Sequence, residues 1–255
     1  MNKKKIIVAN WKMHPRTLSE ARENFQKIKR KADTLTKVAT VVCPPFIFLD
    51  LLSKKATSKC ALGAQDVFWQ VEGAYTGEIS PAQLSAMNVS YVILGHSERR
   101  ALGETDEIIQ KKVKASLEYR LNVILCIGEH ERDARGQYLS FLKDQIKKCL
   151  FKIPGKHLER LIIAYEPIWA IGAKAKSADT SESFFETAIF IRKVLSDMFG
   201  KTTAFNVPIL YGGSVNEYNA EGFLKDGNAA GLLVGCASLD PEEFNEILKI
   251  AQRTK

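Results

Sequence analysis

The sequence predicts an α/β protein in which eight parallel strands close into a single (β/α)8 barrel spanning residues 1–255. Short apolar runs rich in β-branched residues recur eight times, and segments with helical periodicity separate them. Strands that are apolar on both faces and joined by helices are typical of parallel sheets. Eight similar units without a Pro- or Ser-rich linker favour a closed barrel as one domain. An open, Rossmann-like sheet is the alternative.

The expected strands follow one another at regular intervals along the chain. In order they are IIVANW (6–11), VATVVCPP (38–45), CALGAQDV (60–67), YVILGH (91–96), NVILCIGE (122–129), LIIAYEP (161–167), VPILYGG (207–213) and AAGLLVGCAS (229–238). None is followed by a GxGxxG or P-loop signature. This argues against a dinucleotide or nucleoside triphosphate site and against the open-sheet alternative.

The intervening segments place apolar residues on one helical face, and two of them begin with clear capping signals. The apolar faces consist of Leu18, Ala21, Phe25, Ile28 and Ala32 in one segment and of Ile109, Val113 and Leu117 in another. Ser80 and Asp240 each precede a proline, which is the pattern of a capping side chain before proline at the first helical position. We therefore expect helices to begin at Pro81 and Pro241.

Composition restricts the partners and the compartment. The chain has 37 Lys+Arg against 29 Asp+Glu, a formal net charge of +8, so anionic partners are favoured. The basic residues are scattered, and we expect no nucleic-acid binding. Apolar stretches reach neither signal-peptide nor membrane-spanning length, so we expect no membrane association. The five cysteines are odd in number and never form a CxxC pair, which predicts free thiols, no zinc site and a cytoplasmic protein.

Polar residues gather at the expected carboxyl ends of the strands, where (β/α)8 barrels carry their active sites. They are Asn10, Lys12, His96, Glu98, Glu129, Glu166, Ser214, Gly235 and Cys236. A carboxylate, an imidazole, an ammonium group and an amide at one mouth can move a proton from a carbon beside a carbonyl while donors hold the enolate oxygen. The glycines in YGGS and LVGCAS can present backbone N–H groups to a phosphate. Together they indicate a phosphorylated small carbonyl substrate and no metal.

These motifs resemble the triosephosphate isomerase family, in the family's order and over nearly the whole chain. The matching stretches are NWKM (10–13), GAYTGEIS (73–80), GHSERR (95–100), CIGE (126–129), AYEPIWAIG (164–172), YGGS (211–214) and GCASL (235–239). The resemblance implies the TIM barrel fold and cofactor-free interconversion of dihydroxyacetone phosphate and D-glyceraldehyde 3-phosphate through an enediolate. It would place the protein in glycolysis and gluconeogenesis.

The resemblance also implies roles for individual residues. Glu166 is the base and His96 a neutral imidazole that acts as the electrophile, kept uncharged by the N-terminus of a short helix near Ser97. Lys12 and Asn10 bind the substrate, with Lys12 close to the developing negative charge. Glu98 orients Lys12.

The phosphate would be held largely by backbone N–H groups of Gly172, Ser214, Gly235 and Cys236, with residues 167–177 forming a lid. Two positions depart from the family pattern. The lid continues as Gly-Ala-Lys-Ala rather than Gly-Thr-Gly-Lys, so Lys174 and Ala175 alter it, and Cys236 replaces a glycine.

The resemblance further implies a homodimer in which the apolar loop around Thr76 inserts into the partner subunit. Two other functions remain open on the residues. A Schiff-base aldolase would use Lys12 as its nucleophile. A phosphate-binding barrel without activity would need only the glycine-rich segments.

Overall fold

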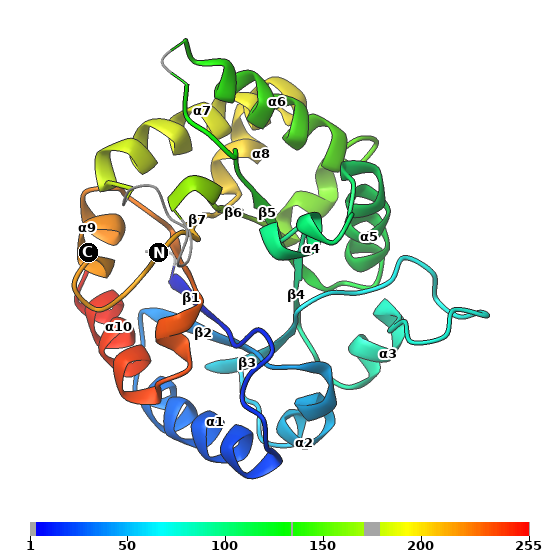
Figure 1. Cartoon of the computed structure of the whole chain (residues 1–255), viewed down its shortest axis with the longest axis vertical. Helices are drawn as coiled ribbons and strands as arrows, with labels where there is room; N and C mark the ends of the chain where they lie inside the picture. The colour runs from blue at the N-terminus through cyan, green and yellow to red at the C-terminus, as the bar shows by residue number, and fades with distance from the viewer. Residues whose placement is uncertain (1–3, 134, 171–178, 255) are drawn as a thin grey trace.

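The computed structural model describes residues 4–133, 135–170 and 179–254, and its eight strands form a closed parallel barrel in chain order (Figure 1). The strands are β1 Lys5–Asn10, β2 Val38–Cys43, β3 Cys60–Ala64, β4 Tyr91–Leu94, β5 Asn122–Ile127, β6 Leu161–Tyr165, β7 Ile209–Tyr211 and β8 Gly231–Val234. The barrel closes because β1 pairs with β8, from Ile6 opposite Gly231 to Ala9 opposite Val234. The predicted fold class is confirmed, and the open sheet is wrong.

Helices surround the barrel on its outside (Figure 1). They are α1 Leu18–Asp33, α2 Leu49–Ser53, α3 Pro81–Ala86, α4 Ser97–Ala101, α5 Asp106–Glu118, α6 Gln137–Cys149, α7 Ser181–Phe199, α8 Lys201–Asn206, α9 Ala220–Lys225 and α10 Pro241–Arg253. The described residues also form short 3-10 helices: η1 Phe46–Phe48, η2 Gly155–Arg160, η3 Ile168–Ala170 and η5 Cys236–Ser238. None of the helices in the described ranges is long and apolar enough to cross a membrane.

The expected caps and apolar faces are confirmed with one exception. The side chain of Ser80 accepts a hydrogen bond from the Gln83 N–H, and that of Asp240 accepts one from the Glu242 N–H. The predicted inner face of α1 is buried apart from Leu18, which is 46% exposed. Leu18 is the first residue of the helix.

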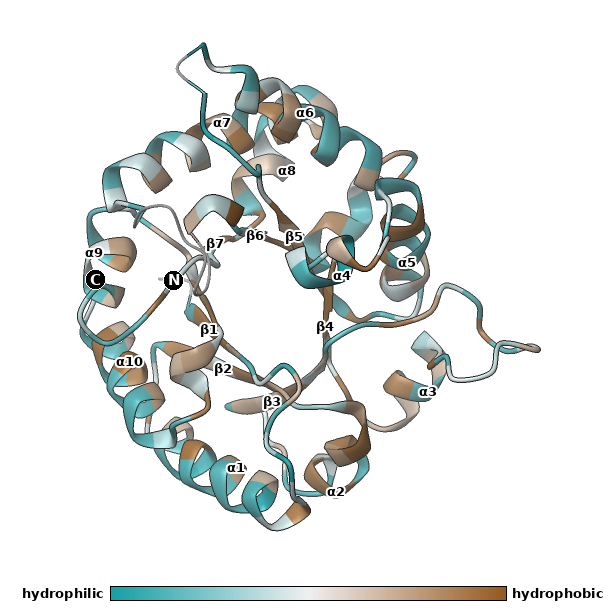
Figure 2. Ribbon diagram, viewed as in Figure 1, coloured by the Kyte–Doolittle hydropathy of each residue, from teal (hydrophilic) through white to brown (hydrophobic). Residues whose placement is uncertain are grey.

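The core has two layers. Inside the barrel, inward-facing residues of the strands fill the lumen; they include Val8, Val41, Ile93, Ile124, Ile162, Leu210 and Leu233. A larger layer lies between the strands and the helices. Figure 2 shows the result, with hydrophobic strands inside and hydrophilic outer helix faces. At the seam, a Cβ on Gly231 would lie 1.8 Å from the Ile6 carbonyl oxygen, so only glycine fits where β8 meets β1.

An aromatic cluster packs against β6 and β7 on the helix side of the barrel. Phe184 of α7 is fully buried and packs edge-on against Tyr211 and Phe223, with ring centroids 5.4 and 6.2 Å apart. Tyr211 and Phe223 stack on each other at 3.6 Å. The cluster joins α7 and α9 to the strand that leads into YGGS.

We expect Phe184→Ala to destabilise the protein by about 3–5 kcal/mol, because it opens a cavity in this cluster. The adjacent Phe185 is 40% exposed, so Phe185→Ala is a matched control that should change stability far less. Urea unfolding of both variants at one protein concentration measures the difference. Equal losses would contradict the packing described.

Candidate active site

A pocket of about 150 Å3 lies at the carboxyl ends of the strands. The residues predicted to act in catalysis or to bind the substrate all line it within the described ranges: Asn10, Lys12, His96, Glu166, Ser214, Gly235 and Cys236. Glu98 and Glu129, which were also expected at this mouth, are not among the lining residues. Gly172, Lys174 and Ala175 lie outside the described residues. Side chains far apart in the sequence thus meet at one mouth, as expected for parallel strands that point the same way.

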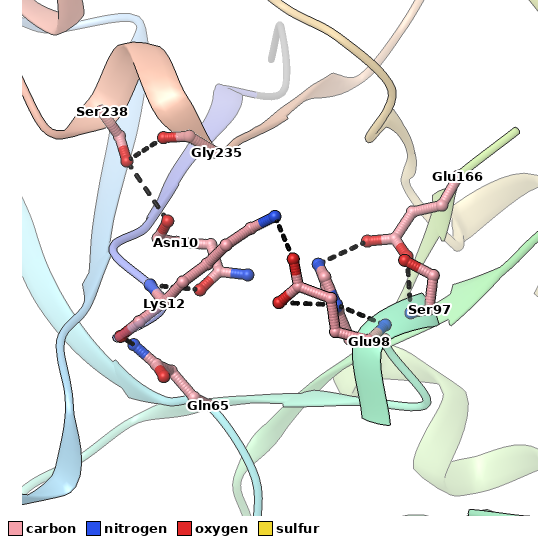
Figure 3. Close-up of polar contacts among 9 residues, drawn as sticks. Asn10, Lys12, Gln65, Ser97, Glu98, Glu166, Gly235 and Ser238 are labelled. Carbon is pink, nitrogen blue, oxygen red and sulfur yellow. Dashed lines mark hydrogen bonds and ion pairs between the residues drawn. The ribbon is translucent and has the colours of Figure 1, made fainter. Parts of the chain in front are cut away.

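Glu166 follows β6, whose five residues are all buried, and is itself only 2% exposed. Its Oε2 accepts a hydrogen bond from the Ser97 N–H at 3.2 Å (Figure 3). Its Oε1 is buried and makes no hydrogen bond within the described residues. The Cys126 thiol lies nearby; burial first, and then the charge of Glu166, raise the pKa of Cys126 well above its usual value. Glu166 thus lines the pocket with one buried carboxylate oxygen that accepts no hydrogen bond among the described residues.

The backbone of Glu166 is fixed by the neighbouring strands. Its N–H donates to the Ile127 carbonyl at 2.7 Å. A Cβ on Gly128 would lie 1.8 Å from the Glu166 carbonyl oxygen, so no side chain fits at that position. The glycine in CIGE is thus required by the close approach of two strand ends.

His96 is the N-cap of α4, and its ring orientation follows from that position. Nδ1 accepts a hydrogen bond from the Glu98 N–H at 3.2 Å. An imidazole nitrogen that accepts has no proton, so a neutral His96 bears its proton on Nε2. Nε2 lies 3.5 Å from Glu166 Oε1. The donor edge of the imidazole and the free carboxylate oxygen face each other across the pocket.

Lys12 adopts a left-handed backbone conformation with φ of 51°. Asn10 Oδ1 accepts from the Lys12 N–H at 3.1 Å, and Gln65 Nε2 donates to the Lys12 carbonyl at 2.8 Å (Figure 3). Gln65 Nε2 also donates to the Cys43 carbonyl at 2.9 Å. The Lys12 ammonium pairs with Glu98 Oε1 at 2.5 Å. The site stabilises an unusual backbone conformation that aims the ammonium group at the pocket.

Gln65 is a site-supporting residue that the sequence reasoning missed. It follows the third strand directly, so the rule used for the other strands, a polar residue at the carboxyl end, would have found it. Its function differs from theirs, because it contacts backbone rather than the pocket.

The opposite wall of the pocket consists of the segments after β7 and β8. The Ser214 hydroxyl donates to the Ala170 carbonyl at 2.9 Å, which connects YGGS to the segment before residue 171. Ser238 Oγ donates to the Gly235 carbonyl at 2.6 Å. Cys236 is exposed and begins η5 without a positive φ, so its side chain causes no backbone strain and its N–H group remains available.

Glu129 has a structural contact that the sequence did not reveal. Its Oε1 accepts from the Tyr165 hydroxyl at 2.7 Å and from Trp169 Nε1 at 2.8 Å. Arg132 lies over the Trp169 ring, 5.8 Å from its centroid. Glu129 thus anchors the residues on both sides of Glu166 rather than facing the pocket.

The described residues contain no group of three or more His, Cys, Asp or Glu placed to hold a metal ion. The fold and the site define a (β/α)8-barrel enzyme for proton transfer on a small anionic carbonyl compound. Comparison with known proteins points to one family. The family described as Triosephosphate isomerase matches residues 5–251.

Relatives named Triosephosphate isomerase are similar along their whole length. The protein of Dictyoglomus turgidum is 41% identical over 97% of this chain and 99% of its own, and that of Natranaerobius thermophilus 39% over 97% and 96%. One from Dehalococcoides mccartyi is 46% identical over 96% of both chains. The chain belongs to the triosephosphate isomerase family, which confirms the resemblance seen in the sequence.

We expect Gly128→Ala to destabilise the protein by about 1–3 kcal/mol, the usual range for overpacking, because the new methyl group collides with the Glu166 backbone. Gly155→Ala is the matched control, since the nearest atom to its added Cβ is 4.0 Å away. Thermal unfolding of the two variants is the measurement. If the two shift alike, the contact between the strand ends is looser than described.

Proposed function

We propose that this site interconverts dihydroxyacetone phosphate and D-glyceraldehyde 3-phosphate through an enediolate, without a metal or an organic cofactor. The observation that supports this best is the unpartnered Glu166 Oε1, 3.5 Å from the Nε2 of His96. A base beside a hydrogen-bond donor is what proton transfer next to a carbonyl requires. The choice of substrate is based on the family to which the chain belongs. The geometry supports the roles of Glu166 as base and His96 as hydrogen-bond donor.

The reaction proceeds in two proton transfers. Glu166 removes a proton from C1 of dihydroxyacetone phosphate, and the C–H electron pair forms the C1–C2 double bond while the carbonyl electrons move to O2. His96 Nε2–H donates to the substrate oxygens as this negative charge develops, and proton exchange between O1 and O2 follows. The protonated Glu166 then returns a proton to C2, the O1 carbonyl forms, and the product is D-glyceraldehyde 3-phosphate. Base and proton are regenerated.

Lys12 and Asn10 bind the substrate, and Lys12 stabilises the developing charge. Backbone N–H groups of Gly172, Ser214, Gly235 and Cys236 hold the phosphate. The lid predicted over residues 167–177 falls mostly outside the described residues and stays a prediction. The contacts of Ser214 and the absence of strain at Cys236 are compatible with this arrangement. Gly172 lies outside the described residues and stays a prediction.

The aldolase alternative fits the geometry less well. A Schiff-base lysine attacks the substrate carbonyl with a free nitrogen, yet Lys12 Nζ is held against the Glu98 carboxylate at 2.5 Å. A phosphate-binding barrel without activity would give no reason for a desolvated carboxylate facing an imidazole. The isomerase is therefore the function that we propose, in glycolysis and gluconeogenesis within the cytoplasm.

Glu166→Gln keeps the shape of the side chain but removes the base, so we expect turnover to fall by on the order of 100-fold or more. A coupled assay of triose phosphate isomerisation measures this. Glu159→Gln, at an exposed position on η2, is the control and should leave the rate unchanged. Full activity of Glu166→Gln, or loss of wild-type activity on adding a chelator, would contradict the proposal. Covalent trapping of substrate on Lys12 by borohydride would support the aldolase instead.

We further propose that the active form is a homodimer. The segment between β3 and α3, which contains Thr76, projects away from the barrel (Figure 1). Its Val71 and Tyr75 are 43% and 44% exposed. Other exposed apolar residues follow neighbouring strands: Met13 at 89%, Ile47 at 79% and Leu102 at 84%. Apolar side chains gathered after β1 to β4 form the kind of surface that a second subunit covers.

A Tyr75→Glu, Thr76→Arg double variant places charges in this loop and should be monomeric, with a lower kcat because Lys12 and Glu98 lose the partner's support. Sedimentation velocity gives the oligomeric state, and the isomerase assay gives kcat. A wild-type monomer with full activity, or a monomeric double variant with undiminished kcat, would refute the requirement for a partner.

A further inference from the structure

A second groove lies on the outer side of the barrel, between α7, α8 and the segment before β8. Its volume is about 560 Å3, against about 150 Å3 for the catalytic pocket, and the two share no lining residue. Three large apolar side chains line it although they are exposed: Phe185 at 40%, Ile189 at 56% and Phe205 at 59%. The wall includes Ile209, the first residue of β7, so the groove lies toward the amino ends of the strands, opposite the active site.

The groove has one sign of charge. Arg192 and Lys193 on α7 and Lys201 on α8 line it, and no carboxylate does among the residues that the structure describes. None of the three cations forms an ion pair in the described part of the chain. Lys201 Nζ and the Arg192 guanidinium lie 5.9 and 5.5 Å from the centroid of the Phe205 ring. A cationic edge thus adjoins an apolar surface.

Arg192 is held in place with part of its hydrogen-bonding capacity unused. Its Nη1 donates to the carbonyls of Ala204 and Val207 at 2.5 and 2.6 Å, which fixes the guanidinium beside α8. Its Nε and Nη2 make no hydrogen bond within the described residues. Burial lowers the pKa of Arg192, and no nearby carboxylate offsets this effect. A positioned, partly desolvated guanidinium with a free edge is suited to a carboxylate.

We propose that this groove binds an organic anion with an apolar body, of the class of medium-chain carboxylates. The carboxylate pairs with the free edge of Arg192, assisted by Lys193 and Lys201, and the hydrocarbon part covers Ile189 and Phe205. The volume falls within the range of small-molecule sites, roughly 300–1,000 Å3. A neutral or cationic molecule of the same length would gain the apolar contact but leave the guanidinium unpaired.

Isothermal titration of the purified full-length chain with decanoate tests the proposal, with decylammonium as the charge-reversed probe. We expect saturable binding of one decanoate per chain and no saturable binding of decylammonium. Ile189→Asp places a carboxylate at an exposed position of the groove, and Lys201→Glu reverses a cation; each should weaken decanoate binding by at least about tenfold, or about 1.4 kcal/mol. Phe151→Asp, at a 59% exposed position outside the groove, is the matched control and should bind as the wild type does.

Four results would overturn the proposal. Displacement of decanoate by inorganic phosphate would place the anion in the catalytic pocket. Unchanged decanoate affinity in Ile189→Asp would show that decanoate does not bind in the groove. Equal affinity for decylammonium would show that the positive charge of the groove does not select the ligand. Sedimentation showing a larger assembly that Ile189→Asp abolishes and Phe151→Asp retains would identify the groove as a contact between copies of the chain. None of these readouts depends on isomerase activity.

Discussion

The close approach of the end of β5 to the backbone of Glu166 is the constraint on which the catalytic site depends. The Glu166 N–H bonds to the Ile127 carbonyl, and Gly128 has no room for a side chain beside it. Gly212, after β7, approaches from the other side, where an added Cβ would lie 3.0 Å from Glu166 Cγ. The carboxylate is therefore placed mainly by strand geometry. Because little of its positioning depends on side-chain partners, one oxygen remains unpaired in a buried site, as a base requires.

Glu98 contacts two polar residues of the pocket, His96 and Lys12, in two different ways. Its backbone N–H sets the imidazole orientation of His96, whereas its carboxylate holds the Lys12 ammonium. The side chains of Lys12 and Glu98 are 32% and 58% exposed, and ion pairs with this exposure contribute roughly 0–1 kcal/mol. An anionic substrate can thus replace Glu98 as the partner of Lys12 at little cost. The backbone contact to His96 does not change in that exchange, so the donor stays aligned while the cation moves.

The sequence predicted the order of the eight strands and the caps at Ser80 and Asp240, because these depend on local patterns. It also predicted that the polar residues at the strand ends converge, because parallel strands point in the same direction. The contact that supports the Lys12 backbone was not predictable, although Gln65 itself stands at a strand end. Gln65 reaches the Lys12 carbonyl across 53 positions of sequence, and nothing local indicates that a side chain at one strand end will bond to the backbone after another. The anchoring of Tyr165 by Glu129, 36 positions apart, is likewise long-range. The roles of the site residues in catalysis stay predictions, since neither geometry nor similarity tests them directly.

Barrel closure explains why the proposed phosphate-binding segment near the end of the chain lies beside a cation near its beginning. Pairing of Ala9 with Val234 sets the register between β1 and β8. The segments that follow these strands then lie side by side, so that a Cβ on Gly235 would be 3.5 Å from Lys12 Cε. An open sheet would place β1 and β8 apart, and the cation would face the base without the backbone donors for the phosphate. The same closure gathers the pocket with Glu166 and His96 at the carboxyl ends of the strands, whereas the outer groove, whose wall includes the first residue of β7, lies toward their amino ends.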